Sequence, residues 1–147
     1  MSRRVSIVKA IAESLKVIDG TGTYKTNITS NSYAKLKFWD EVNDFPSIYT
    51  VTGTEMREYH PAGFAWGFLN ASIKVYCKGE DSQQELEDLL EDIETVLDST
   101  NGVIVYDTDN QYSTSEISIT SITTDEGLLT PYAVGEINLL IRYQIMK

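Results

Sequence analysis

Hydrophobic and polar positions change their period once between residues 63 and 100, and this change predicts a strand followed by a helix. From residue 71 to residue 78 the two kinds of side chain alternate, which is the period of a half-buried strand with Ala71, Ile73, Val75 and Cys77 on one face. Beyond a break at 79–81, Ser82 and Glu85 form the sequence of a capping box that opens a helix. Six apolar residues fall on one stripe of this helix: Leu86, Leu89, Leu90, Ile93, Val96 and Leu97.

A second amphipathic helix is predicted over residues 4–18. Its apolar positions recur at spacings of three and four, whereas Lys9, Glu13 and Lys16 face away from them: Val5, Val8, Ile11, Ala12 and Leu15. Two glycines at 20 and 22 provide the positive φ that ends helices. We expect this helix to pack on the core, and the alternative is a helix that binds a partner.

The segment between this helix and residue 53 carries weaker signals. Residues 24–28 are expected to form a short strand and residues 29–32 a turn. Residues 33–39 fit a strand or a helical turn, and the pattern does not decide between them. Pro46 restricts the residue before it to extended backbone, so we place a boundary at 44–46, followed by a strand over 47–52 that ends at Gly53.

Residues 54–68 predict a long β-hairpin that turns at the Pro-Ala-Gly sequence of residues 61–63. The arms carry residue types that are enriched in the hot spots of protein interfaces, and we expect at least the tip to project. The alternative is a pair of core strands rich in aromatic residues. The candidate contact residues on this hairpin are Arg57, Tyr59, His60, Phe64 and Trp66.

The C-terminal part of the chain predicts three more strands. They span residues 103–106, 115–123 and 132–146, separated by a turn at 107–110 and a loop at 125–131, after a helix-ending Asn101-Gly102 pair. Two helices and about six strands predict a single α+β domain over residues 1–147. We expect two layers, with a mainly antiparallel sheet, both helices packed on one face, and a projecting β-hairpin.

The net charge of the chain and the lack of a long apolar stretch argue against nucleic acids and membranes as partners. The 147 residues include 22 acidic and 12 basic side chains, giving a net charge of −10 that disfavours nonspecific binding to DNA and to anionic membranes. No stretch approaches the roughly 20 apolar residues of a membrane span, and no export signal is visible. Cys77, the only cysteine, is expected to be a small buried hydrophobe. Protein partners inside the cell that makes the chain are therefore the expectation.

No arrangement of residues predicts catalysis, a metal or a cofactor. His60 is the only histidine, so a zinc site would lack ligands. The sequence that begins at Asp107 starts like a calcium-binding loop, but Tyr112 and Ser118 stand where such a loop requires Gly and Glu. Phosphate-binding loops and the Gly-x-Ser-x-Gly elbow of hydrolases are missing. We therefore do not expect an enzyme.

The helix predicted around residues 82–97 is strongly acidic and contains no Lys or Arg. A solvated face is the simplest interpretation, and a surface complementary to a basic partner is the next. Glu87, Glu91 and Glu94 are the candidate residues of such a surface.

Four strings, together with the amphipathic N-terminal helix, resemble the tail terminator (tail-completion) proteins of long-tailed bacteriophages, the group similar to minor tail protein U. They are DFPSIYTVTGTE at 44–55, SIKVYCKG at 72–79, ELEDLLEDIETVL at 85–97 and GEINLLIRY at 135–143. The likeness spans nearly the whole chain and depends on element order and general texture, because this group has no signature motif.

The resemblance implies a small α+β virion subunit that assembles, typically as a hexameric ring, on the head-proximal end of a completed tail. There it would stop tube growth and present a surface to the head connector. The implied partners are copies of itself, a tail tube or sheath protein and a head-completion or neck protein, while DNA passes through the ring without sequence-specific binding. No catalytic residue or cofactor is implied.

Two other interpretations remain open on sequence grounds. The chain could be another neck, sheath-initiating or tube component of a phage, built on a related α+β subunit. It could also be a cytoplasmic ligand-binding or enzyme-accessory domain, which predicts a monomer with an enclosed apolar pocket.

Overall fold

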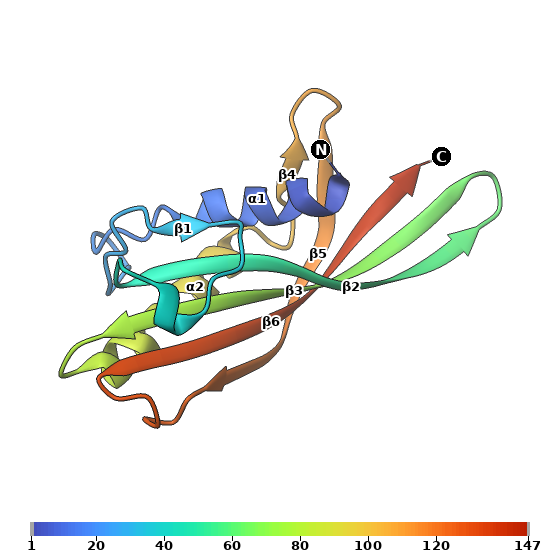
Figure 1. The fold of residues 1–147 in the computed structure, drawn as a ribbon. Helices are drawn as coiled ribbons and strands as arrows, with labels where there is room; N and C mark the ends of the chain where they lie inside the picture. The colour runs from blue at the N-terminus through green and yellow to red at the C-terminus, as the bar shows by residue number, and fades with distance from the viewer. Residues whose placement is uncertain (1, 147) are drawn as a thin grey trace.

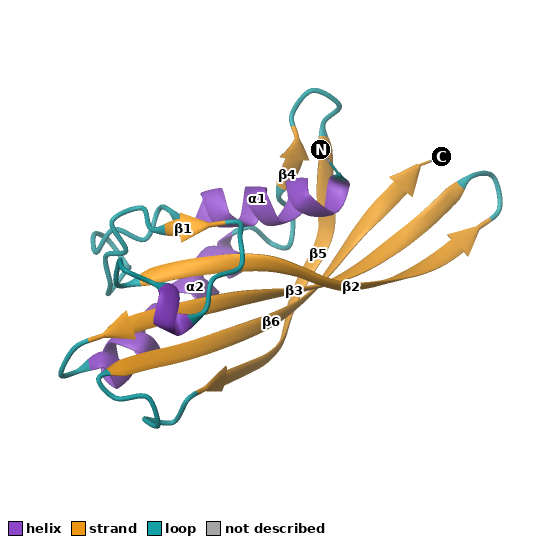
Figure 2. Cartoon of the chain, in the orientation of Figure 1, coloured by secondary structure: helices purple, strands orange, loops and turns teal. Residues whose placement is uncertain are grey.

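The computed structural model of the chain describes residues 2–146 and has an α+β fold (Figures 1 and 2). Within these residues, two α-helices and one short 3-10 helix accompany a six-stranded sheet of order β1-β2-β3-β6-β5-β4. Only β1 and β2 are parallel, and all other neighbours are antiparallel. The elements are α1 (Arg3–Leu15), β1 (Ser32–Tyr33), η1 (Trp39–Glu41), β2 (Ser47–His60), β3 (Phe64–Lys78), α2 (Ser82–Ser99), β4 (Val105–Asp107), β5 (Tyr112–Thr124) and β6 (Tyr132–Met146).

The sheet is strongly curled, which refines the two-layer arrangement expected from the sequence. At its centre β3 and β6 pair along their whole lengths, from Phe64 opposite Met146 to Lys78 opposite Tyr132. Figure 1 shows the strands lying beside the helices at one end, whereas the β2–β3 hairpin and the end of β6 twist away from them at the other. Long antiparallel strands accumulate such twist, because each strand is rotated relative to its neighbour.

One hydrophobic cluster joins both helices to one face of this sheet. All six predicted apolar residues of α2 are buried in it, together with the four predicted inward positions of the 71–78 strand, which is part of β3. Cys77 is completely buried there, as expected. Val5 departs from the prediction, with 38% of its surface exposed, because it lies at the margin of the apolar stripe of α1.

The opposite face of the sheet is less polar than the alternation suggests. Tyr76, which was placed on a polar face, is buried with Val42 and Tyr49 in a small second cluster. Its hydroxyl donates a hydrogen bond to the carbonyl oxygen of Lys37, at 2.5 Å. The segment between β1 and β2 therefore covers this part of the sheet.

The helix α2 begins one residue earlier than the predicted capping box implies, and that capping box does not form. Its N-cap is Asp81, whose side chain makes no capping bond, and Ser82 is instead the first helical residue. The backbone N–H of Glu85 donates to the carbonyl oxygen of Asp81. Ser82 is therefore part of the first turn of the helix, where it is buried.

The strand expected at 24–28 does not form, apart from one isolated bridge between Asp19 and Asn27. The backbone N–H groups of Lys25 and Thr26 donate instead to the carboxylate of Asp92 on α2, at 2.8–3.0 Å, and the Thr26 hydroxyl donates to it as well. Asp92 is 1% exposed. A buried carboxylate needs such donors, so the segment binds the helix rather than a neighbouring strand.

Between residues 33 and 53, the structure resolves one open question and shows that one predicted strand end, at Gly53, is wrong. The undecided 33–39 segment contains only the end of the two-residue strand β1 and the start of η1. Gly53 does not end a strand, because β2 continues through it to His60 with a shift of register between Thr52 and Glu55. A Cβ at Gly53 would lie 3.0 Å from the carbonyl oxygen of Asn70, so the bulge brings the two backbones close together.

The C-terminal half follows the prediction with small differences in length. The strand expected at 103–106 is β4, which begins two residues later, and β5 is longer than predicted, whereas β6 has the predicted bounds. Asn101 and Gly102 have the positive φ values, 54° and 79°, expected after a helix.

Candidate assembly surface

The β2–β3 hairpin places the first group of candidate residues. It turns at 61–63 as predicted, where Ala62 and Gly63 have φ values of 70° and 76°. His60 pairs with Phe64 across the turn, and the ladder continues as far as Glu55 opposite Leu69. Figure 1 shows this end of the hairpin extending beyond both helices.

Alternation along the two arms divides the candidate residues between opposite faces. Glu58 lies opposite Trp66 and His60 opposite Phe64, so these side chains share one face, which we call the outer hairpin face. Arg57 lies opposite Gly67 and Tyr59 opposite Ala65, on the face continuous with the core, which we call the inner hairpin face. The five candidates therefore form two surfaces and not one.

The outer hairpin face is an aromatic and cationic cluster. The rings of Phe64 and Trp66 pack edge to face, with centroids 5.3 Å apart, and the His60 ring lies 5.5 Å from that of Phe64. The guanidinium of Arg142 from β6 lies over the Trp66 ring at 4.6 Å, a cation–π contact. Phe64 and Trp66 are half-buried, and aromatic side chains held in place beside an arginine are typical of binding hot spots.

The inner hairpin face is organised around the carboxylate of Glu55, whose side chain is only 6% exposed. It accepts hydrogen bonds from the Tyr143 hydroxyl, at 2.5 Å, and from the Arg57 Nε, at 2.7 Å, and Arg4 of α1 lies 3.9 Å away. A hydrogen bond with Tyr59, and then the one with Glu55, raise the pKa of Arg57. Burial, and then the bond to Glu55, raise the pKa of Tyr143. These contacts join α1, β2 and β6 where the hairpin leaves the core.

The three acidic candidates lie elsewhere, on the solvent side of α2. Glu91 forms an ion pair with Lys25, at 2.9 Å, and this hydrogen bond raises the pKa of Lys25. Glu87, Glu91 and Glu94 line a hollow of about 370 Å³, whose apolar lining comes from Leu90 and from Ile122 of β5. The acidic surface thus borders the β5 side of the sheet and does not join the hairpin.

Sequence reasoning missed Glu55, Arg4, Tyr143 and Arg142, which hold the hairpin residues in place. The sequence does not reveal the bulge between Thr52 and Glu55, and this bulge turns the Glu55 side chain toward the core. Without it, the contacts of Glu55 with Tyr143 and Arg4 could not be foreseen. The division of the candidates was accessible, since a turn at 61–63 already puts His60 opposite Phe64 and Tyr59 opposite residue 65.

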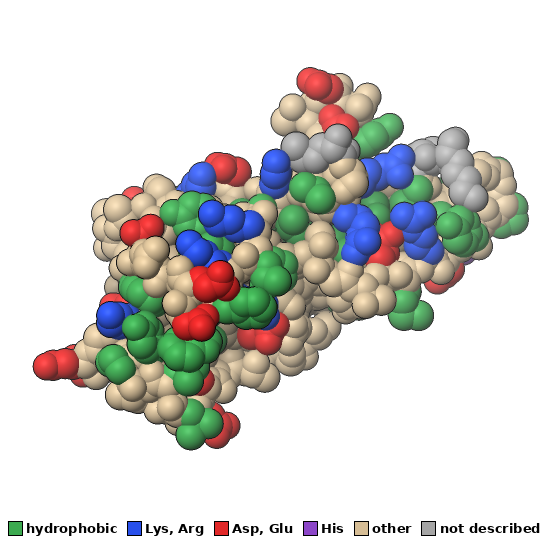
Figure 3. Space-filling model, viewed as in Figure 1, with side chains coloured by type: hydrophobic (Ala, Val, Ile, Leu, Met, Phe, Trp, Pro, Cys, Tyr) green, Lys and Arg blue, Asp and Glu red, His purple; other side chains and the backbone are tan. Residues whose placement is uncertain are grey.

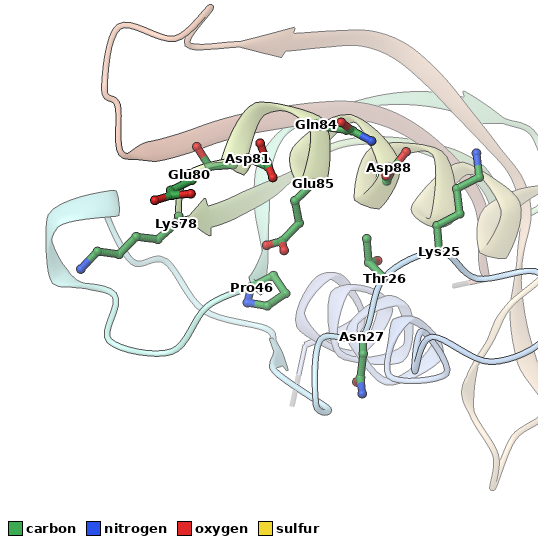
Figure 4. A pocket seen from close by; sticks show the side chains of 12 residues that line it. Lys25, Thr26, Asn27, Pro46, Lys78, Glu80, Asp81, Gln84, Glu85 and Asp88 are labelled. Atoms are coloured by element: carbon green, nitrogen blue, oxygen red, sulfur yellow. The ribbon is translucent and has the colours of Figure 1, made fainter.

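A larger hollow, of about 740 Å³, lies where α2 begins, and it is lined mainly by polar and charged residues. Figure 4 shows Glu85 pointing from α2 toward Pro46, with Lys25 and Lys78 on opposite sides of the opening. Among residues 2–146, no three His, Cys, Asp or Glu side chains gather as metal ligands would. Burial raises the pKa of the Cys77 thiol, so this group is not an activated nucleophile.

In the same described range, no helix has the length and apolar character required to cross a membrane.

Comparison with known proteins gives the family. The family described as "Bacteriophage Tail Tube Terminator Protein" matches residues 1–147. The chain is 37% identical over 154 residues to the tail tube terminator protein p142 of Escherichia phage T5, covering 98% of this chain and 95% of that protein. A chain from the virion of a native gene transfer agent particle has a similar fold, with a TM-score of 0.57 at 11% identity, over 98% of this chain and 100% of that one. This chain therefore belongs to the bacteriophage tail tube terminator proteins, structural and non-enzymatic components of the virion tail.

Proposed function

We propose that the chain ends growth of the tail tube by closing into a ring of identical subunits, six by family resemblance, on the head-proximal end of the tube. The far side of this ring would receive a head-completion or neck protein. Membership of the tube terminator family supports the termination role, and the surfaces of the subunit support the ring.

The observation that carries the proposal is the uncovered end of the β2–β3 hairpin. No helix lies over it in Figure 1, yet its two faces carry aromatic and charged side chains in fixed arrangements. Met56 and Tyr59 there are 69% and 57% exposed. Exposed apolar groups gathered with an arginine match the composition of protein interfaces.

The hairpin and the acidic surface of α2 are separate patches of the subunit, and this separation fits a ring. A closed ring uses head-to-tail contacts, in which one patch of a subunit meets a different patch of its neighbour. The hairpin, with Arg57, Tyr59, His60, Phe64 and Trp66, would supply adhesion to a neighbouring subunit or to the tube. The acidic surface of Glu87, Glu91 and Glu94 would meet a basic partner or line the lumen, where it would repel passing DNA.

Disabling the gene in its phage and imaging the particles by electron microscopy tests this function. Tails of uncontrolled excess length without heads are expected, and supplying the wild-type gene in trans should restore normal length. Normal virions would contradict the proposal. Headless tails of normal length would also contradict it, since they would assign the chain to joining alone.

A further inference from the structure

Basic side chains gather in the N-terminal part of this acidic chain. Residues 2–37 contain seven basic and two acidic side chains, a net charge of +5. Residues 38–147 contain five basic and twenty acidic side chains, a net charge of −15. The first range builds α1 and β1, and Figure 3 shows several basic side chains over these two elements. One side of the subunit is therefore basic, although the chain as a whole is acidic.

A groove of about 400 Å³ lies between α1 and β1 on this side, and we call it the basic groove. Its charged lining consists of three lysines, at positions 9, 16 and 35, and one acid, Glu13. Glu13 pairs with Lys16, at 2.8 Å, and Lys35 lies over the Tyr33 ring, at 5.0 Å. Among residues 2–146, neither Lys9 nor Lys35 forms an ion pair. The groove therefore keeps two positive charges that no carboxylate of the subunit balances.

The acidic surface of α2 has the opposite charge and a convex shape, because it is the solvent side of a helix. Glu87, Glu91 and Glu94 recur at spacings of four and three, so they lie on one stripe. No Lys or Arg lines the hollow that they border. Of the three, only Glu91 forms an ion pair within the described residues, with Lys25. Glu87 and Glu94 thus keep negative charges that the subunit does not balance.

The two surfaces match in spacing and belong to different sides of the subunit. Lys9 and Lys16 are seven residues apart on α1, as Glu87 and Glu94 are on α2, which places each pair about 10.5 Å apart along its helix. The basic groove borders β1, at one edge of the sheet, whereas the acidic surface borders β5, near the other edge. No residue lines both, so each subunit carries two separate patches of opposite charge.

We propose that the acidic surface of α2 in one subunit docks in the basic groove between α1 and β1 of the next subunit in the ring. The proposal rests on the ring described above and names the basic partner of the acidic surface, a second copy of this chain. Charge complementarity selects this occupant, because every copy brings both patches and a ring of copies leaves neither unbalanced. Two acidic surfaces or two basic grooves repel each other, so the contact is head-to-tail and can close a ring.

Reversal of charge tests this contact on tail tubes that lack the terminator. One variant carries Lys9→Glu and Lys35→Glu in the basic groove, and another carries Glu87→Lys and Glu94→Lys on the acidic surface. Glu91 is kept, because its ion pair lies within the subunit. Each variant should require about tenfold more protein than the wild type to form rings on tubes, as counted by electron microscopy.

The decisive variant combines all four reversals and has the wild-type net charge of −10. Both patches then exchange their signs and attract each other again, so rings should form within about threefold of the wild-type concentration. The matched control carries Asp109→Lys and Glu126→Lys, at exposed loop positions outside both patches, and adds the same charge as the acidic-surface variant. This control should assemble nearly as the wild type does. Thermal melting confirms that every variant folds.

Undiminished ring formation by either double variant, or an equal loss in the control, would overturn the docking and leave the terminator function standing. Loss in both double variants without recovery in the combined one would also overturn it, since the groove would then bind another acidic component, such as the tube protein or DNA. Absence of any ring from wild-type protein on tubes would instead overturn the function proposed above, and the docking with it.

Discussion

The β2–β3 hairpin has two halves that are built from the same pair of strands and differ in what covers them. In the half nearer to α2, Ile73 and Val75 are buried beneath the helices. In the distal half, Phe64 and Trp66 pack against each other and Arg142, without a helix above them. The comparison teaches that the near half contributes to the stability of the fold, whereas the distal half keeps side chains such as Met56 and Tyr59 exposed.

The largest expected effect lies in α2, one of the helices that cover the near half, at Asp92. Replacing it by Ala leaves two backbone N–H groups and the Thr26 hydroxyl without their buried acceptor. We expect the free energy of unfolding to fall by about 3 kcal/mol, measured by chemical denaturation. Asp98→Ala, at an exposed position of the same helix, is the control and should change it little. Equal effects of the two variants would show that the carboxylate does not anchor the 24–28 segment.

The junction between the two halves should show an intermediate effect. Glu55→Ala removes the acceptor of Tyr143 and the partner of Arg57, and we expect a loss of about 1–2 kcal/mol in the free energy of unfolding. Glu58→Ala is the matched control, because Glu58 lies on the same strand, is exposed and forms an ion pair with His60. If both variants unfold alike, Glu55 does not fix the direction of the hairpin.

The distal half should tolerate change in the isolated subunit. The double variant Trp66→Ala and Arg57→Ala is expected to lose less than about 1 kcal/mol of stability while assembling on tubes more weakly than the wild type. The two residues lie on opposite faces and have different partners, so their effects on assembly should add. Loss of cooperative thermal melting would show that these positions belong to the core.

The smallest effect concerns acid stability and the loop before β6. Burial raises the pKa of Asp125, whereas hydrogen bonds from Val134, Gln83 and Leu129 lower it. The hydrogen bonds together outweigh burial, so the pKa lies below the ordinary value of 3.8. A carboxyl group with a lowered pKa stabilises the fold above its unfolded pKa, and this contribution disappears as the pH falls through the folded pKa.

Asp125→Asn should therefore lower the free energy of unfolding near pH 7 by less than about 1 kcal/mol, because the group is partly exposed. The difference from the wild type should shrink below pH 4, as denaturation at a series of pH values would show. A difference that stays constant from pH 7 to pH 3 would contradict the assignment.

The sequence predicted the parts of the fold that a repeating pattern determines. The stripe of α2 and the alternation of residues 71–78 were found, because burial on one face leaves a period in the sequence. The turn at 61–63 was found from its Pro-Ala-Gly sequence. The prediction was wrong where one tertiary contact replaces a local one. Asp92 takes the donors of the 24–28 segment, and the helix starts from Asp81 rather than capping with Ser82.

For the candidate surfaces, residue types indicated that a contact surface exists, whereas sequence positions said less about how its residues are arranged. Aromatic residues and arginine in the hairpin indicated a contact surface, and the predicted turn at 61–63 already implied their division between two faces. The partners that hold them, such as Glu55 and Tyr143, depend on the bulge after Thr52. Whether those residues contact a neighbouring subunit remains a prediction.

The bulge after Thr52 makes the geometry of the tip sensitive to chain length at a distant point. A residue gained or lost between Thr52 and Glu55 would rotate the rest of β2 by half a pleat, so that Glu58 would point toward Tyr143 and Arg57 would stand beside Trp66. Insertions and deletions at this position could thus remodel what relatives of this subunit recognise while every residue of the tip is kept.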